Sequence, residues 1–268
     1  MVINKKNGPI FIIGILILFI YCILYIYILP KNTELKGVKV TTYGDSITAQ
    51  GGWQKILKFR FGFDEVYNRG IGSTTYTKND LYAYLDADGN YISRSNLVKD
   101  QPENTIKIES WLSSHDRIGT IPQDTDVVLI MAGTNDFGYA EIGELSYPYN
   151  EDTFKNSVAL TVQRVKEHIG EEKLVILMSQ LNSRCNDGSS DEIVNSIGLK
   201  DSDYVKAVEE VAAELNVPYI DVYNNTIINT WNRKVFIKDT VHPNKIGQIE
   251  LARVISQGIE DILKQINN

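Results

Sequence analysis

The sequence has little cysteine and little histidine. Only two cysteines, Cys22 and Cys185, occur among the 268 residues, too few for the disulfide framework that holds small secreted domains together. Of the three histidines, His115 and His168 lie in polar or charged stretches and look like solvated surface positions, and neither has metal-ligand spacing with His242. We therefore expect no disulfide framework, no metal and no cofactor.

Basic residues are outnumbered by acidic ones. The chain has 27 Lys and Arg against 34 Asp and Glu, a net charge of −7. Only Lys5 and Lys6 carry charge within residues 1–30, so residues 31–268 hold 25 basic and 34 acidic residues, a net charge of −9. Such an acidic chain repels phosphate backbones, and we expect no nucleic-acid partner. The hydrophobic fraction of 43% disfavours a disordered chain.

Charge is absent from one whole segment. Residues 10–29 read IFIIGILILFIYCILYIYIL, with three tyrosines toward the far end. Twenty helical residues rise about 30 Å, the thickness of the hydrocarbon core of a bilayer. The segment predicts a transmembrane signal-anchor helix over residues 9–30, after a short tail of residues 1–8. The lipid bilayer is therefore an expected partner of residues 10–29.

A cleaved secretory signal is the main alternative to an anchor. Such a signal has an apolar region of about 7–15 residues and a small-residue cleavage site, whereas this segment is longer and offers no such site. The lysines flanking the segment are nearly balanced, and they weakly favour a cytoplasmic N-terminus. We expect a single-pass protein of the cell membrane, with the rest of the chain extracellular.

After a linker of residues 31–36, apolar runs alternate with helical patterns over one domain of residues 37–268. Strands are expected at residues 38–43, 66–68, 126–132, 174–178 and 218–222, and helices at 53–61, 153–169, 203–215 and 244–266. Strands that alternate with helices indicate a parallel sheet covered on both faces. Residues 77–104 are polar, and we interpret them as a surface excursion of the same domain.

Four short segments rich in polar and small residues follow the expected strands or lie near the C-terminus. They are Gly44-Asp45-Ser46, residues 68–75 (NRGIGSTT), residues 133–136 (GTND) and residues 239–244 (DTVHPN). In parallel sheets ligands bind beyond the carboxyl ends of the strands. We expect all four segments to gather on that rim.

These segments contain the groups needed for nucleophilic catalysis. Ser46 offers a hydroxyl, His242 a base, and Asp239 a carboxylate three residues earlier that can orient the imidazole. Backbone N–H groups around Gly72 and the side-chain amide of Asn135 could complete an oxyanion hole. Each segment alone has an ordinary explanation as a turn or a helix cap, so it is their order along the chain that favours catalysis.

That order resembles the SGNH hydrolases, also called GDSL-type esterases and lipases, over about residues 37–268. The resemblance implies a three-layer α/β/α sandwich with a five-stranded parallel sheet, similar to flavodoxin. It implies Ser46 as nucleophile, His242 as base and Asp239 as the partner of the base. It further implies Asn135 and the backbone of the second motif as oxyanion donors.

The second motif, the segment of residues 68–75, departs from the family pattern at one position. The family usually has glycine at the place aligned with Ser73, one residue after Gly72. A backbone N–H does not require glycine unless the conformation does. The sequence leaves open whether Gly72 or Ser73 supplies the oxyanion N–H, and Asp45 and Asp136 are expected as supporting residues beside the motifs.

The function that follows is that of a membrane-anchored serine esterase acting through an acyl-enzyme. We expect short acyl groups, O-acetyl above all, on cell-envelope or extracellular carbohydrate, because no long apolar lid segment lies beside the motifs. Residues 77–104 and 137–150 are rich in Tyr, Asn and Asp, which suit sugar hydroxyls. A lysophospholipase or lipase, an acyltransferase with the same triad, and a noncatalytic glycan-binding module are the alternatives.

Overall fold

The computed structural model describes residues 34–95, 104–184 and 193–267. The expected N-terminal tail, the transmembrane helix, both cysteines and residues 31–33 of the linker lie outside these ranges. Within them, no helix is both long and apolar enough to cross a membrane.

A five-stranded parallel sheet forms the centre of the domain, as expected. Its strands lie in the order β2-β1-β6-β7-β8. They are β1 (Lys39–Gly44), β2 (Glu65–Gly70), β6 (Val127–Met131), β7 (Leu174–Met178) and β8 (Tyr219–Ile220). Gly44 pairs with Gly70 on one side and with Met131 on the other. Three strands therefore end level, and the segments that follow them open at the same edge of the sheet.

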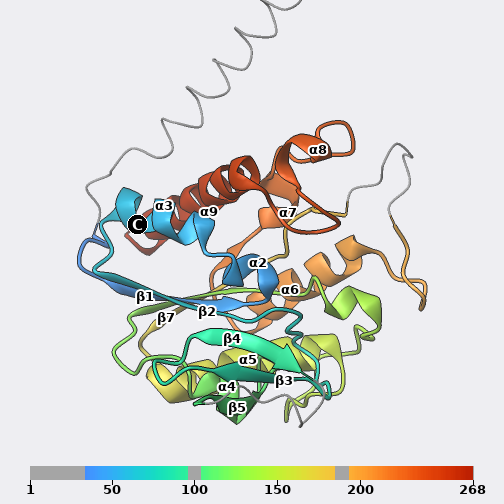
Figure 1. Cartoon of the computed structure of the whole chain (residues 1–268), viewed down its shortest axis with the longest axis horizontal. Helices are drawn as coiled ribbons and strands as arrows, with labels where there is room; N and C mark the ends of the chain where they lie inside the picture. Colours follow the sequence, from blue (N-terminus) through green and yellow to red (C-terminus); the bar gives the residue numbers. More distant parts are fainter. Residues whose placement is uncertain (1–33, 96–103, 185–192, 268) are drawn as a thin grey trace, which may run out of the picture.

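Helices cover both faces of this sheet (Figure 1). The four long ones are α3 (Gly52–Phe61), α5 (Phe154–Ile169), α6 (Asp201–Glu214) and α9 (Lys245–Ile266). Side chains alternate along β6, so Val128 packs in the cluster formed with α5 and α6, whereas Leu129 packs in the cluster formed with α3 and α9. The result is a three-layer α/β/α sandwich with a hydrophobic cluster on each side.

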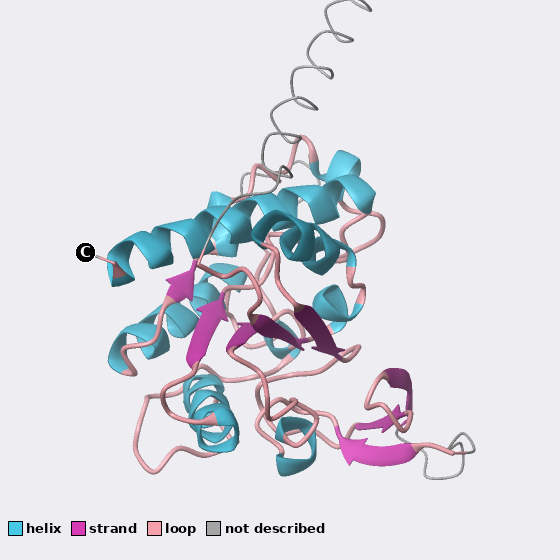
Figure 2. Cartoon of the chain, turned by 90° about the vertical axis from the view of Figure 1, so that its left-hand side faces the viewer, coloured by secondary structure: helices cyan, strands magenta, loops and turns pink. Residues whose placement is uncertain are grey.

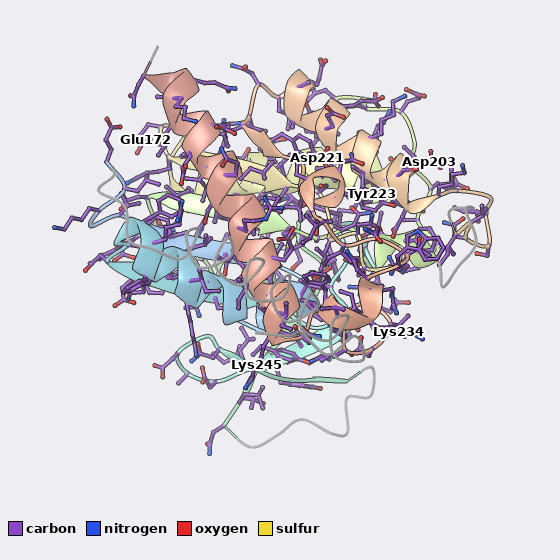
Figure 3. The ribbon with its side chains drawn as sticks, turned by 90° about the horizontal axis from the view of Figure 1, so that it is seen from above. Glu172, Asp203, Asp221, Tyr223, Lys234 and Lys245 are labelled. Carbon is purple, nitrogen blue, oxygen red and sulfur yellow. The ribbon has the colours of Figure 1, made fainter. Side chains whose placement is uncertain are left out.

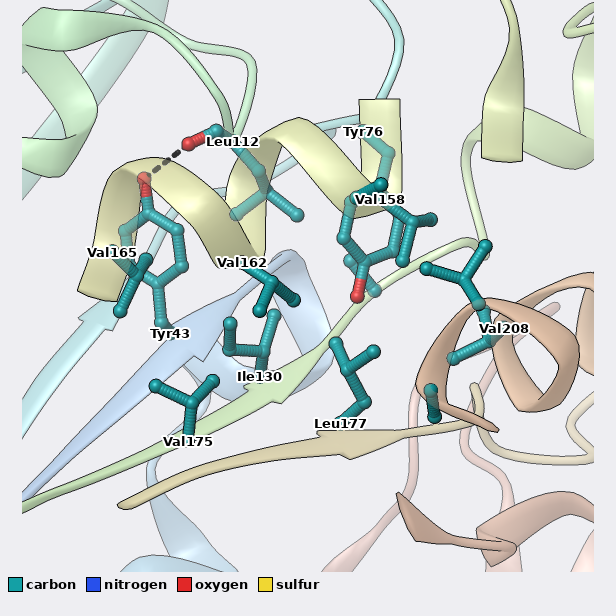
Figure 4. Packing of buried hydrophobic residues seen from close by; sticks show 14 of the residues in the cluster. Tyr43, Tyr76, Leu112, Ile130, Val158, Val162, Val165, Val175, Leu177 and Val208 are labelled. Carbon is teal, nitrogen blue, oxygen red and sulfur yellow. Dashed lines mark hydrogen bonds between the residues drawn. The ribbon is translucent and has the colours of Figure 1, made fainter. Parts of the chain in front are cut away.

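Tyr43 of β1 links the sheet to the segment that precedes α4 (His115–Ile118). Its ring is fully buried among valines of α5 and β7, and its hydroxyl donates to the carbonyl of Leu112 at 2.6 Å (Figure 4). A buried hydroxyl needs such a partner to offset the loss of water. This bond fixes the segment around residue 112 next to the end of β1.

A second, three-stranded antiparallel sheet departs from the expectation for residues 77–104. It has the order β4-β3-β5 and is set apart from the main sheet (Figure 2). Its strands are β3 (Tyr82–Leu85), β4 (Tyr91–Ser95) and β5 (Ile106–Glu109). Ala83 and Leu85 are buried, so this region is more than a polar surface excursion. These strands have only four or five residues each, so they give a weak signal in the sequence.

The remaining differences concern short elements. The last strand is shorter than expected. Among the described residues, five small helices were not expected: α2 (Ser46–Ala49), α4 (His115–Ile118), η2 (Asp136–Gly138), α7 (Val222–Asn225) and α8 (Arg233–Phe236). Thr153 is the N-cap residue of α5, but its side chain makes no capping bond. Elements this short depend on tertiary contacts rather than on intrinsic propensity.

Candidate active site

Ser46 lies at the sharp turn between β1 and α2. Asp45 caps α2, and its carboxylate accepts a hydrogen bond from the N–H of Ile47 at 2.9 Å. Gly44 leaves no room for a side chain, since a Cβ there would lie 2.0 Å from the carbonyl oxygen of Met131. This close approach sets the turn at the edge of the sheet, where Ser46 is half-buried.

Asp45 itself is almost completely buried, with 1% of its surface exposed. Burial raises the pKa of this carboxyl to about 6, although the hydrogen bond from Ile47 favours the charged form. A group that changes charge near neutral pH therefore sits directly before Ser46.

Ser46, His242 and Asp239 form one hydrogen-bonded chain. The Nε2 of His242 lies 2.8 Å from the Oγ of Ser46, and its Nδ1 lies 3.0 Å from an Oδ of Asp239. A carboxylate accepts hydrogen bonds, so Nδ1 carries a proton and a neutral ring accepts the serine O–H at Nε2. The structure thus brings together three side chains that the sequence places up to 196 positions apart.

The carboxylate of Asp239 is set up to remain ionised. Partial desolvation acts to raise its pKa, but hydrogen bonds from the backbone N–H groups of His242 and Val241 and from the His242 ring lower the pKa to about 2. A negative charge therefore stays beside the imidazole through the neutral and mildly acidic range.

Arg233 of α8 holds the loop that carries these two residues. Its guanidinium donates to the carbonyl of Ser183 at 2.7 Å and to those of Asp239, at 2.8 Å, and Thr240. The loop after β7 and the Asp239–His242 loop are thereby fastened to one side chain. No pattern in the sequence indicates this role of Arg233.

Helix α9 begins directly after the same loop. The side chain of Asn244 accepts from the N–H groups of Ile246 and Gly247, an N-cap that defines the start of the helix. Figure 3 shows Lys245 at the end of α9 nearest Lys234 of α8. The Asp239–His242 loop is therefore held between the end of α8 and the start of α9.

The loop after β2 turns tightly beside Ser46. The N–H of Ile71 donates to the carbonyl of Gly44 at 3.0 Å, and the N–H of Thr74 donates to the carbonyl of Ile71 at 3.3 Å. Ser73, the third residue of this turn, has a φ of +56°, whereas Gly72 is not left-handed. The conformation that favours glycine thus falls at Ser73 and not at Gly72.

Asn135 connects this loop to the segment after β6. Its side-chain nitrogen donates to the carbonyl of Thr74 at 2.8 Å. The amide carries two hydrogens and this bond uses one of them, so it also orients the second. Asn135 is half-buried, and it follows β6 at the rim where the sequence predicted its segment.

Asp136, the next residue, accepts hydrogen bonds from the main chain of another segment. Its fully buried carboxylate accepts from the N–H groups of Tyr76 and Thr77, both at 3.0 Å, and from the hydroxyl of Thr77 at 2.8 Å. Burial raises the pKa of Asp136 to about 6, and these hydrogen bonds limit the rise. Asp136 therefore anchors the chain that follows the second motif.

Arg117 is a further residue at the strand ends that the sequence did not indicate. Its guanidinium is fully buried and donates to the carbonyls of Arg69, at 3.0 Å, and Gly44, at 3.2 Å. It also lies 4.6 Å from the ring centroid of Tyr43. Arg117 therefore ties the end of β1 to the end of β2, and no local pattern around it could have shown this.

Arg184, after β7, plays a similar part for the loop after β6. It pairs with Asp201 at 3.1 Å, donates to the carbonyl of Thr134, and lies 4.8 Å from the ring centroid of Phe137. The segment that contains Asn135 is thereby also held by a residue that follows β7.

The other two histidines make different contacts. His115 is exposed, as expected, but His168 is half-buried and its Nε2 lies 2.8 Å from the carbonyl oxygen of Ile121. Across residues 34–95, 104–184 and 193–267, no three His, Cys, Asp or Glu side chains are grouped as metal ligands.

A Ser-His-Asp chain at the carboxyl rim of a five-stranded parallel sheet points to the class of α/β serine hydrolases. Residues 42–248 match the GDSL-like Lipase/Acylhydrolase family. The match covers most of the chain, so the chain belongs to this family of carboxylic ester hydrolases.

Solved structures share the fold. A protein from Lactobacillus plantarum has 21% sequence identity and a TM-score of 0.61, over 87% of this chain and 99% of that chain. A catalytic mutant of Axe2, an acetylxylan esterase from Geobacillus stearothermophilus, has 20% identity and a TM-score of 0.52, over 84% of this chain and 94% of that chain. No curated protein sequence matches the chain.

Proposed function

We propose that this protein is a serine esterase with Ser46 as nucleophile, His242 as general base and Asp239 as the partner of the base. The observation that carries the proposal is the 2.8 Å contact from Ser46 Oγ to His242 Nε2, continued at 3.0 Å to Asp239. A nucleophile, a base and an orienting carboxylate within hydrogen-bond reach are the requirements of acyl transfer.

The first half of the reaction forms an acyl-enzyme. Ser46 Oγ attacks the ester carbonyl carbon while Nε2 of His242 takes the serine proton, and ionised Asp239 stabilises the imidazolium. The carbonyl oxygen becomes an oxyanion, which accepts hydrogen bonds from the Asn135 side chain and the backbone N–H groups of Ser46 and Ser73. His242 then gives the proton to the departing alcohol oxygen as the carbon–oxygen bond breaks.

The second half returns the enzyme to its starting state. Water attacks the acyl carbon and gives a proton to Nε2 of His242. The bond from that carbon to Ser46 Oγ breaks, and His242 returns the proton to the serine. The products are one carboxylic acid and one alcohol for each ester and water consumed.

We propose O-acetyl esters of carbohydrate as the substrates. Axe2, which has the same fold, is an acetylxylan esterase, and this supports a sugar ester over a long-chain lipid. The segment that follows Asp136 includes two aromatic side chains in contact, Tyr147 and Tyr149, at 5.5 Å between ring centroids. Tyr147 is exposed and Tyr149 is half-buried, and the exposed ring of Tyr147 can stack on a sugar ring.

The test is hydrolysis of p-nitrophenyl esters by the full chain with detergent present. We expect acetate to be hydrolysed faster than octanoate, and Ser46→Ala and His242→Ala to lose at least about a thousand-fold in kcat. Exposed Ser146→Ala and His115→Ala are the matched controls and should keep full activity. Equal rates for wild type, Ser46→Ala and His242→Ala would overturn the triad.

We further propose that residues 10–29 anchor the enzyme in the cell membrane, with the N-terminus cytoplasmic and the catalytic domain extracellular. The support is the uncharged run of twenty residues and the lysine count around it. Protease added to intact cells should digest the catalytic domain. Complete protection of the domain until the cells are lysed would contradict this orientation.

A further inference from the structure

The second sheet, β4-β3-β5, is inserted between β2 and β6 in the chain and is called the inserted sheet below. It packs directly on the loop after β2, called the oxyanion loop because it includes Ser73. Its small core contains Ala83 and Leu85 of β3, Ile108 of β5, and Ile71 of the loop itself, and Tyr91 of β4 packs against this cluster. Ile71 is buried to 1% exposure. The position of the loop after β2 and the position of the inserted sheet are therefore coupled through shared apolar contacts.

Arg69, the next-to-last residue of β2, fixes the hairpin between β3 and β4. Its Nε donates to the carbonyl of Thr120 at 2.8 Å, and its terminal nitrogens donate to Asn90 Oδ1 at 3.4 Å and to the carbonyl of Asp88 at 3.3 Å. Asp86 closes the same hairpin by accepting from the N–H of Asn90 at 2.8 Å. Tyr91 follows directly, so its backbone is held at the end of β2.

The hydroxyl of Tyr91 reaches the oxyanion loop. A methyl group added to Gly72 would lie 3.6 Å from this hydroxyl oxygen, an ordinary van der Waals contact. Gly72 comes directly before Ser73, and the ring of Tyr91 is only half-buried. A phenolic O–H that can both donate and accept thus stands beside the loop expected to bind the ester carbonyl.

We propose that Tyr91 determines specificity, its hydroxyl forming a hydrogen bond with a hydroxyl group of the alcohol half of the ester. The proposal rests on the esterase function proposed above and names the substrate class of that site as esters of polyhydroxylated alcohols. An acetyl methyl group offers no hydrogen-bonding atom, whereas a sugar offers several around the ester. The inserted sheet thereby forms one wall of the site for the alcohol.

The experiment compares two acetate esters of primary alcohols. One is glucose acetylated on its primary hydroxyl, and the other is ethyl acetate, which has no further hydroxyl. For the full chain, Tyr91→Phe should lower kcat/KM for the glucose ester about five-fold, the effect of one neutral hydrogen bond, mainly through KM. The same variant should hydrolyse ethyl acetate and p-nitrophenyl acetate at the wild-type rate.

Tyr82→Phe is the matched control. It removes a hydroxyl from the same inserted sheet, but Tyr82 lies at the far end of β3, opposite Ser95 and Glu109, whereas Tyr91 pairs with Leu85. Tyr82→Phe should leave the rates of hydrolysis of the glucose ester, ethyl acetate and p-nitrophenyl acetate unchanged.

Wild-type rates with Tyr91→Phe on the glucose ester would overturn the specificity role, as would an equal loss on all three esters. If wild type hydrolyses none of the esters, the esterase proposal itself fails, so the two failures are distinguishable.

Discussion

Two aspartates near Ser46 have opposite electrostatic environments. Asp239 receives two backbone N–H groups and an imidazole, which lower its pKa to about 2, whereas burial raises the pKa of Asp45 to about 6. Asp239 therefore stays ionised from neutral pH into the mildly acidic range, whereas Asp45 gains a proton as the pH falls through about 6. Asp45 acts as a cap on α2, and we assign it to positioning Ser46 rather than to the proton transfer.

Asp239→Asn tests this assignment through the pH dependence of stability. The folded-state pKa of Asp239 lies below the ordinary value of 3.8, so its carboxylate stabilises the fold above that value and the contribution is lost as pH falls toward 2. The stability deficit of Asp239→Asn should be largest above pH 5 and shrink toward pH 2, measured by urea unfolding. A deficit that is the same at every pH would show that the charge is not involved.

The left-handed backbone conformation of Ser73 can be tested by substitution. A left-handed φ costs a residue with a side chain about 1 kcal/mol relative to glycine. If the backbone N–H of Ser73 is the oxyanion donor, Ser73→Gly should keep wild-type kcat. Ser73→Val, which resists this conformation most, should lower kcat at least about ten-fold. Equal activity for Ser73→Gly and Ser73→Val, measured on p-nitrophenyl acetate, would remove this residue from the oxyanion hole.

Asn135 is the side-chain donor of the proposed oxyanion hole. Asn135→Ala should lower kcat by about a hundred-fold or more with little change in KM, because the bond it offers strengthens only as the oxyanion forms. Its bond to Thr74 is also lost, so thermal unfolding of the variant must be compared with that of wild type. A full effect on KM with unchanged kcat would argue for a ground-state contact instead.

The elements of the main sheet could be predicted from the sequence, and those of the inserted sheet could not. β7 is an unbroken apolar run, and its predicted bounds, Leu174–Met178, are those observed. β3 and β5 have four residues each, and Ala83, Leu85 and Ile108 of these strands are buried together with Ile71. Their stability comes from contacts between distant segments, which a local pattern does not encode.

The contacts at the ends of the strands could also be predicted only in part from the sequence. The four polar segments were predicted to gather on one rim, and the structure brings Ser46, Asn135, Asp239 and His242 there. The arginines that hold these segments were missed. Arg117 donates to two main-chain carbonyls, and carbonyls are present at every residue, so the sequence carries no sign of which ones it meets.

Arg117→Met tests the link between β1 and β2. Loss of two charge-assisted bonds should lower the free energy of unfolding by about 2 kcal/mol, and kcat of the folded protein should fall because Ser46 and Ser73 follow these strands. The control is Arg60→Met, at a buried arginine that pairs with Glu260 between α3 and α9. It should lose stability but keep kcat. If Arg117→Met keeps the wild-type kcat, Arg117 contributes to stability but does not position Ser46 and Ser73.

At the scale of the whole molecule, two buried carboxyls among the described residues have raised pKa values. Asp45 and Asp136 both have a pKa of about 6 because burial disfavours their charged forms. The folded protein therefore binds these protons more tightly than the unfolded chain does. Their contribution to stability is greatest below pH 4, and it is lost as pH rises through about 6.

Asp136→Asn should make the pH dependence of stability shallower. The variant is less stable at every pH, because an amide cannot accept all the hydrogen bonds of the carboxylate. Its free energy of unfolding should nevertheless fall less than that of wild type between pH 4 and pH 7, measured by urea unfolding. A slope equal to that of wild type would mean that Asp136 does not titrate in this range.

The central claim is that Ser46 is activated as a nucleophile by His242. The most direct measurement is the intact mass of the full chain after treatment with a fluorophosphonate, which reacts covalently with activated serines. We predict that wild type gains one phosphonyl group, that peptide analysis places it on Ser46, and that Ser46→Ala and His242→Ala gain none. An unlabelled wild type, or equal labelling of Ser46→Ala, would contradict the account.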